Sequence, residues 1–159
     1  MPPSLLLLRC AALYVLLLAA QAVLPTLTAQ VHAWQARVVH IADGDTVTVL
    51  RGDRQQVRVR LYGIDAPEKG HPYSGKATRA LAAMVGNTVV ELTPMDVDHY
   101  GRLVAVVTPA GAQRSANEQL LALGLARVYR RHCTADFCAR WLELEAQARA
   151  AQAGMWRRR

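Results

Sequence analysis

Between Gln35 and Tyr62, apolar and polar positions alternate with a period close to two. Such alternation is typical of half-buried β-strands. Turns built from Asp and Gly interrupt the alternation twice, and two later apolar stretches have a similar character. The pattern therefore predicts five strands, at about 36–42, 45–51, 55–62, 88–93 and 102–108.

Three other segments show features of helices. Apolar spacing predicts one helix over about 75–86 and a last helix over about 135–153. Between them, Ser115 and Glu118 have the spacing of a capping box. This motif predicts a short helix that is closed by Gly124.

On the last helix, Trp141, Leu144 and Met155 recur at helical spacing and are predicted to face the core. Five short strands, with helices between and after them, fit a small barrel with helical cover. The predicted fold class is α+β, mainly β barrel: an OB-fold five-stranded barrel with three helices. The chain has 159 residues, which is enough for one such domain, and we assign it to residues 34–159.

The N-terminal segment differs in composition from the rest. A single charged residue, Arg9, precedes the apolar run Leu13–Leu24. This pattern predicts a signal peptide over residues 1–33, cleaved at its end or after Ala29. The alternative is an uncleaved N-terminal anchor, because Leu5–Leu27 is almost long enough to span a bilayer. We expect an exported protein, periplasmic or secreted, without membrane contact once the leader is removed.

Two cysteines, Cys133 and Cys138, remain after removal of the leader. In an oxidising compartment such a pair favours a disulfide. The loop that this bond closes is short, so we expect a modest stabilisation. The alternative is a pair of free thiols.

The formal net charge of +7 favours an anionic partner: nucleic acid, an acidic surface or anionic lipid. Acids and arginines are grouped in three segments next to predicted strands, at 43–46, 58–68 and 98–102. Taken singly, each segment has an ordinary explanation as a hairpin turn, a solvated loop or a surface charge.

Taken together, the three segments resemble the staphylococcal-nuclease (thermonuclease-like) family. The motifs are Asp-Gly-Asp-Thr at 43–46, Arg-Leu-Tyr-Gly-Ile-Asp-Ala-Pro-Glu at 60–68 and Tyr-Gly-Arg at 100–102. The similarity runs from about Ala36 to Trp156, and the order and spacing of the motifs carry it. The resemblance implies a Ca²⁺-dependent endonuclease that hydrolyses phosphodiester bonds of DNA and RNA with little sequence specificity. No protein partner is implied, and the sequence leaves the oligomeric state open, with a monomer as the default expectation.

The resemblance also implies a metal site. Asp45 and Asp65 match the family's Ca²⁺-binding carboxylates, and Ala66 matches the residue that offers its backbone carbonyl. Ca²⁺ is a hard cation that prefers such oxygen ligands, so the residue types agree with the role.

Four further residues match the family's catalytic and substrate-binding groups, and a fifth position departs from the family. Arg60 and Arg102 match its phosphate-binding arginines, whose planar guanidinium groups suit phosphate oxygens. Glu68 matches the acid that deprotonates or orients the attacking water. Tyr100 and His99 are expected near the bound nucleotide, with His99 standing where the best-known member has lysine.

Two other functions remain open at this point. The first is a catalytically inactive OB module that binds nucleic acid. The second is a structural envelope protein that its leader holds in the membrane. Inactive copies of such a domain typically lose the metal-binding acids or the arginines, and this chain retains all of them. That retention favours the active nuclease.

Overall fold

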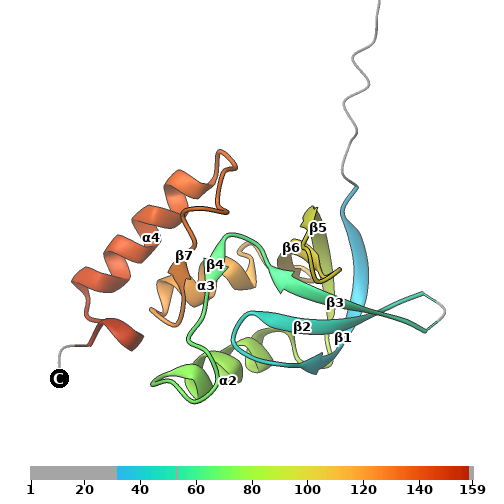
Figure 1. Ribbon diagram of the computed structural model, residues 1–159, viewed down its shortest axis with the longest axis horizontal. Coiled ribbons are helices and arrows are strands. Elements are labelled where there is room, and N and C mark those ends of the chain that lie inside the picture. The colour runs from blue at the N-terminus through green and yellow to red at the C-terminus, as the bar shows by residue number, and fades with distance from the viewer. Residues whose placement is uncertain (1–31, 53, 158–159) are drawn as a thin grey trace, which may run out of the picture. The chain divides into compact units, whose positions relative to one another are not determined.

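Five strands close into a barrel in the order β1-β2-β3-β6-β5 in the computed structural model, which describes residues 32–52 and 54–157 (Figure 1). The predicted α+β fold with a five-stranded OB-type barrel is thereby confirmed. The strands lie within a few residues of their predicted positions, except that β5 continues four residues further. Their bounds are β1 Trp34–Ile41, β2 Thr46–Arg51, β3 Gln55–Leu61, β5 Val89–Val97 and β6 Leu103–Pro109.

Closure of the barrel depends on one parallel pairing. All other neighbours in the barrel pair antiparallel, whereas β3 and β6 pair in parallel, with Val59 opposite Leu103 and Leu61 opposite Ala105. This pairing brings β3, which carries Arg60, beside the strand that follows Arg102 directly. Two segments that are 42 positions apart in sequence therefore meet.

The alternation along the strands separates the core from the surface. Val47, Val49, Val59 and Leu61 are almost completely buried, whereas Arg58 between them is exposed. Full burial of one such aliphatic side chain stabilises the fold by about 1.5–3 kcal/mol.

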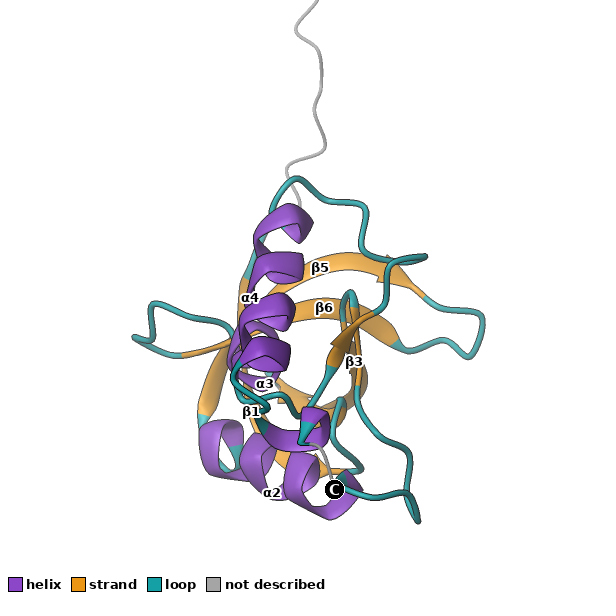
Figure 2. Ribbon diagram, turned by 90° about the vertical axis from the view of Figure 1, so that its left-hand side faces the viewer, coloured by secondary structure: helices purple, strands orange, loops and turns teal. Residues whose placement is uncertain are grey.

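Three helices, α2 (Ser74–Val85), α3 (Ala116–Ala122) and α4 (Cys138–Ala150), cover one side of the barrel (Figure 2). The middle helix, α3, packs against both α2 and α4 and against β6. Its capping box is confirmed: Ser115 Oγ accepts the Glu118 N–H at 3.2 Å, and Glu118 Oε2 accepts the Ser115 N–H at 3.1 Å.

Asn117 on α3 ties this helix to the barrel. Its side chain is completely buried. Its amide donates to the Tyr62 carbonyl at 2.9 Å, and its carbonyl oxygen accepts the Val107 N–H at 3.0 Å. Because unpaired buried polar groups are costly, these two bonds fix the end of β3 relative to β6 and α3.

A second, two-stranded sheet was not predicted. It pairs β4 (Ile64–Asp65) with β7 (Arg127–Val128) in antiparallel register. Strands of two residues are too short to show an alternating pattern, so only the folded chain reveals them.

The prediction for the last helix is wrong at both ends. The helix begins at Cys138, because the Tyr62 hydroxyl accepts the N–H groups of Thr134 and Ala135 and holds that segment as a loop. It ends at Ala150, shortly before Gln152, whose φ of 52° is incompatible with a right-handed helix. Met155 consequently lies in the 3₁₀ turn η1 (Gly154–Trp156), not on the helix.

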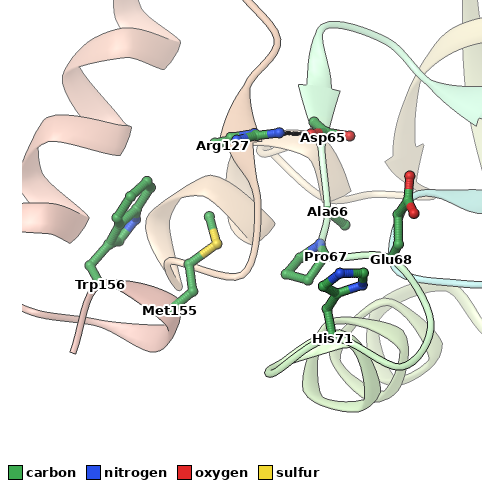
Figure 3. Close-up of a pocket in the computed structure, with 8 residues that line it drawn as sticks. All are labelled: Asp65, Ala66, Pro67, Glu68, His71, Arg127, Met155 and Trp156. Atoms are coloured by element: carbon green, nitrogen blue, oxygen red, sulfur yellow. Dashed lines mark hydrogen bonds and ion pairs between the residues drawn. The ribbon is translucent and has the colours of Figure 1, made fainter. Parts of the chain in front are cut away.

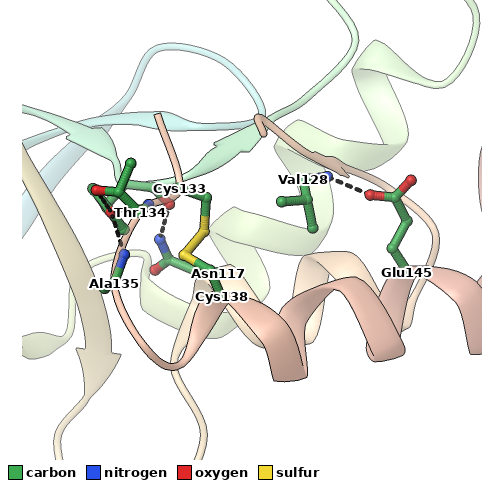
Figure 4. The surroundings of a disulfide bond; sticks show 8 residues. Asn117, Val128, Cys133, Thr134, Ala135, Cys138 and Glu145 are labelled. Atoms are coloured by element: carbon green, nitrogen blue, oxygen red, sulfur yellow. Dashed lines mark hydrogen bonds between the residues drawn. A yellow bond between two sulfur atoms is a disulfide. The ribbon is translucent and has the colours of Figure 1, made fainter. Parts of the chain in front are cut away.

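A disulfide joins Cys133 to Cys138, with 5.7 Å between the two Cα atoms, so the predicted bond is confirmed (Figure 4). It packs directly against Gly63, which connects β3 to β4 with a φ of 64°. A Cβ at Gly63 would lie 2.8 Å from Cys133 Sγ, so this close approach requires glycine.

The predicted signal peptide at residues 1–33 falls almost entirely outside the described residues and stays a prediction. Within residues 32–52 and 54–157, no helix combines the length and the apolar character that crossing a membrane requires.

Candidate active site

Asp45 lies buried in the turn between β1 and β2, where it joins two distant segments. Its Oδ2 accepts the backbone N–H of Ala66 at 2.8 Å, and its Oδ1 accepts the Thr46 hydroxyl at 3.2 Å. The adjacent Gly44 makes this approach possible, because a Cβ there would lie 2.8 Å from the Ala66 Cβ. The Asp-Gly-Asp-Thr segment is therefore more than an ordinary hairpin turn.

The carboxyl group of Asp45 is electrostatically unusual. Burial raises its pKa to about 6, although Arg60 and the Ala66 N–H act in the opposite direction. Asp43 adds to the increase, since its carboxylate is a nearby like charge. The negative charge of Asp45 is thus only partly compensated by the protein.

Arg60 on β3 connects the two predicted metal-binding acids. Its guanidinium Nη1 forms an ion pair with Asp45 Oδ2, and its Nη2 lies 3.4 Å from Asp65 Oδ1. The Arg60 side chain is only 17% exposed. Within the described chain, Nη1 makes no well-formed hydrogen bond although it is buried.

Asp65 on β4 is held from a second side by an arginine that was not predicted. Arg127 on β7 donates from Nε and Nη2 to Asp65 Oδ2, at 2.9 and 2.7 Å (Figure 3). Both oxygens of the Asp65 carboxylate therefore face guanidinium groups.

A pocket opens beside this cluster (Figure 3). Glu68 lines it as an exposed side chain in the loop after β4. Met155 and Trp156 form the opposite wall, so η1 reaches the site. The complete lining is Asp65, Ala66, Pro67, Glu68, His71, Arg127, Met155 and Trp156.

A second pocket contains both predicted arginines, Arg60 and Arg102. Asp98 holds Arg102 in place by accepting its Nε–H at 2.6 Å and its backbone N–H at 2.9 Å. Partial burial raises the pKa of Asp98, but the hydrogen bonds from Arg102 outweigh this effect and lower the pKa below its usual value. Asp98 therefore stays negatively charged beside Arg102. Arg60 lies between the acidic cluster and this pocket.

The rings of His99 and Tyr100 lie beside each other, close to Arg102. Their ring centroids are 3.7 Å apart, and His99 lines the second pocket. Tyr100 is 74% exposed, and the Arg102 guanidinium lies 5.4 Å from its ring centroid. An exposed aromatic ring beside an arginine offers a face on which a base can stack.

The residues of the cluster fit Ca²⁺. The donors of Asp45 and Asp65 are hard carboxylate oxygens, and Asp45 is buried, so a divalent cation would compensate a carboxylate charge that lies out of solvent. Among the described residues, no three acidic, histidine or cysteine side chains are already gathered as a metal-binding group. The predicted ligand set consists of two carboxylates and the Ala66 carbonyl. It would need water or phosphate oxygens to complete the coordination of the ion.

The structure thus brings Asp45, Ala66, Arg60 and Asp65 into one connected cluster, with Glu68 and Arg102 in the adjoining pockets. Sequence analysis missed Arg127, because no local pattern distinguishes it from Arg130 and Arg131. Other pocket-lining residues were missed for a similar reason, because only long-range folding brings them to the pockets. They are His71, His132, Tyr129 and Trp156.

Comparison with known proteins gives a consistent result. The family model described as "Staphylococcal nuclease homologue" matches residues 58–158. "Protein ParB" of Escherichia coli is 38% identical over 150 residues, which cover 88% of this chain and 84% of that protein. "Micrococcal nuclease" of Shigella flexneri is 36% identical over 140 residues, covering 82% and 79%. An "Uncharacterized endonuclease" of Escherichia coli O157:H7 is 35% identical over 133 residues, covering 83% and 81%.

Proposed function

Because the chain belongs to the staphylococcal nuclease homologue family and is a phosphodiester-hydrolysing nuclease, we propose that it cuts both DNA and RNA with Ca²⁺ as its cofactor. We further propose that cleavage has little sequence specificity. The position of Arg60 supports this proposal most directly. It contacts both candidate metal-binding acids and lines the pocket that contains the second candidate arginine.

In this mechanism, Asp45, Asp65 and the Ala66 carbonyl would hold Ca²⁺. When bound, Ca²⁺ polarises the phosphoryl group and compensates its negative charge. Asp45 is suited to the role because the Ala66 N–H fixes one of its oxygens at 2.8 Å. Asp65 is suited because it lines the pocket.

Arg60 and Arg102 donate hydrogen bonds to the phosphate oxygens as these gain charge in the transition state. The Asp98 carboxylate orients Arg102 before substrate binds, which reduces the entropy lost on binding. Glu68 either removes a proton from the attacking water or orients that water. Its exposed side chain in the pocket leaves room for water and substrate.

A nuclease assay tests the proposal. The purified protein is incubated with single-stranded DNA, double-stranded DNA and RNA, in Ca²⁺, in Mg²⁺ and in chelator. We expect acid-soluble products from all three substrates in Ca²⁺ and none in chelator. Binding of nucleic acid without cleavage under every condition would identify an inactive binding module instead.

We also propose that the protein is exported by a cleaved leader and acts as a monomer, in the periplasm or outside the cell. The Cys133–Cys138 bond supports this location, because structural disulfides persist in oxidising compartments. N-terminal sequencing of the protein from cell fractions tests the proposal. A full-length chain in the membrane fraction would indicate an anchor.

A further inference from the structure

We propose that the Arg127 guanidinium group competes with the divalent cation for Asp65. It donates two hydrogen bonds to Asp65 Oδ2, the oxygen that a bound ion would need. This inference rests on the proposed function, since it takes Asp65 as a ligand of Ca²⁺.

The register of the small sheet creates the contact. In the pairing of β4 with β7, Asp65 lies directly opposite Arg127. Opposite residues of an antiparallel pair share one face of the sheet, so their side chains meet. Both Nε and Nη2 of Arg127 then donate to the same oxygen, at 2.9 and 2.7 Å.

The backbone of Arg127 is fixed independently of Asp65. The next residue, Val128, donates its N–H to Glu145 Oε2 at 2.6 Å (Figure 4). Glu145 is a buried carboxylate on α4 and also pairs with Arg149. Substitution of the Arg127 side chain therefore leaves the strand anchored and removes only the contact with Asp65.

The two guanidinium groups on Asp65 differ in how easily they can leave. Arg60 is 17% exposed and also pairs with the buried Asp45, so its displacement would leave a buried charge uncompensated. The Arg127 side chain is 63% exposed and can turn into solvent. Exposed ion pairs contribute little free energy, so a divalent cation can displace Arg127 at small cost.

The contact between Arg127 and Asp65 therefore lowers the affinity of the site for Ca²⁺. Arg127 must release Asp65 Oδ2 before that oxygen can coordinate an ion. A variant without this side chain has no such competition and binds Ca²⁺ more tightly. A purely structural role would have the reverse result, because loss of a supporting contact loosens Asp65 and weakens binding.

Calorimetric titration of the purified protein with Ca²⁺, without nucleic acid, measures this difference. We compare wild type with Arg127→Ala, Arg127→Lys and Arg130→Ala at about 0.15 M salt, where distant charges are screened. Arg130 is the matched control, because it is an exposed arginine in the same segment. Thermal melting in chelator verifies that each variant is folded.

We expect Arg127→Ala to raise the Ca²⁺ affinity about two- to fivefold, as the modest strength of an exposed pair implies. Arg127→Lys retains the charge but not the paired donors, so its affinity lies between those of wild type and Arg127→Ala. Arg130→Ala is expected to stay close to wild type.

Unchanged or weaker Ca²⁺ binding in Arg127→Ala overturns the inference, while the proposed function stands if wild type binds Ca²⁺ and cuts nucleic acid. An equal gain in Arg130→Ala also overturns it, since general charge would then explain the effect. A wild-type protein that binds no Ca²⁺ refutes the proposed cofactor, and the inference with it.

Discussion

The backbone N–H of Ala66 donates a hydrogen bond of 2.8 Å to Asp45 Oδ2, although the two residues are 21 positions apart in the chain. This bond joins the turn after β1 to the loop after β4. It places a buried carboxylate beside the segment that carries Asp65 and Glu68.

Asp45→Asn is expected to change how stability depends on pH in the absence of metal. Burial raises the pKa of Asp45 from 3.8 to about 6, so the native state binds more protons than the unfolded state between these values. The contribution of Asp45 to the free energy of unfolding therefore falls as pH rises through this window. Asparagine does not titrate and removes that decrease.

Chemical denaturation in chelator at pH 4, 5, 6 and 7 measures this effect. Relative to wild type, Asp45→Asn is expected to gain on the order of 2 kcal/mol between pH 4 and pH 7. Arg60 and Asp43, which surround the carboxyl group, are unchanged in the variant. Asp136→Asn, at an exposed position, serves as control. A constant difference between variant and wild type across the pH range would contradict the prediction.

Glu68→Gln is expected to lower kcat by about 10²- to 10⁴-fold, because the amide cannot accept a proton from water. Stability is expected to change by less than about 0.5 kcal/mol, since Glu68 is exposed. Steady-state cleavage and thermal melting measure the two quantities. Glu143→Gln, an exposed substitution on α4, is the control. Wild-type turnover in Glu68→Gln would exclude Glu68 from the chemical step.

Arg102→Ala is expected to lower kcat by about 10²-fold, which is typical for loss of one donor to the transition state. Arg102→Lys recovers only part of the rate, because lysine lacks the planar fork that Asp98 orients. Single-turnover cleavage with saturating enzyme separates this effect from binding. Arg114→Ala removes an exposed arginine elsewhere and is expected to retain full activity. If Arg102→Ala alters only KM, Arg102 binds the substrate equally well in the ground state and the transition state and does not lower the barrier of the chemical step.

Loss of the disulfide in Cys133→Ala/Cys138→Ala is expected to cost about 2 kcal/mol of stability, as the short closed loop implies. Activity is also expected to fall, because the bond packs against Gly63 between the segments that carry Arg60 and Asp65. Urea denaturation with and without reductant measures the stability. Reductant is expected to destabilise wild type to the level of the double variant and to leave that variant unchanged. Equal stability of both proteins without reductant would show that the bond contributes nothing.

Much of the barrel could be predicted because strand and helix patterns are local. The alternation around Val47, Val49 and Val59 indicates which side chains face the core, and it can be recognised within each strand alone. The capping box of Ser115 and Glu118 is similarly local, since both partners lie within one helical turn. The start of the last helix was not predictable, because Tyr62, more than 70 positions earlier, determines where it begins.

For this protein, the sequence by itself determined the strands, the capped helix and the residue types of the site, because these depend on neighbours a few positions apart. Only the tertiary structure decided that Asp65 faces both Arg60 and Arg127, and that Asp45 is buried with a raised pKa. Those properties arise from the pairing of β4 with β7 and the closure of the barrel. Both depend on contacts between residues far apart in the chain, which no local pattern encodes.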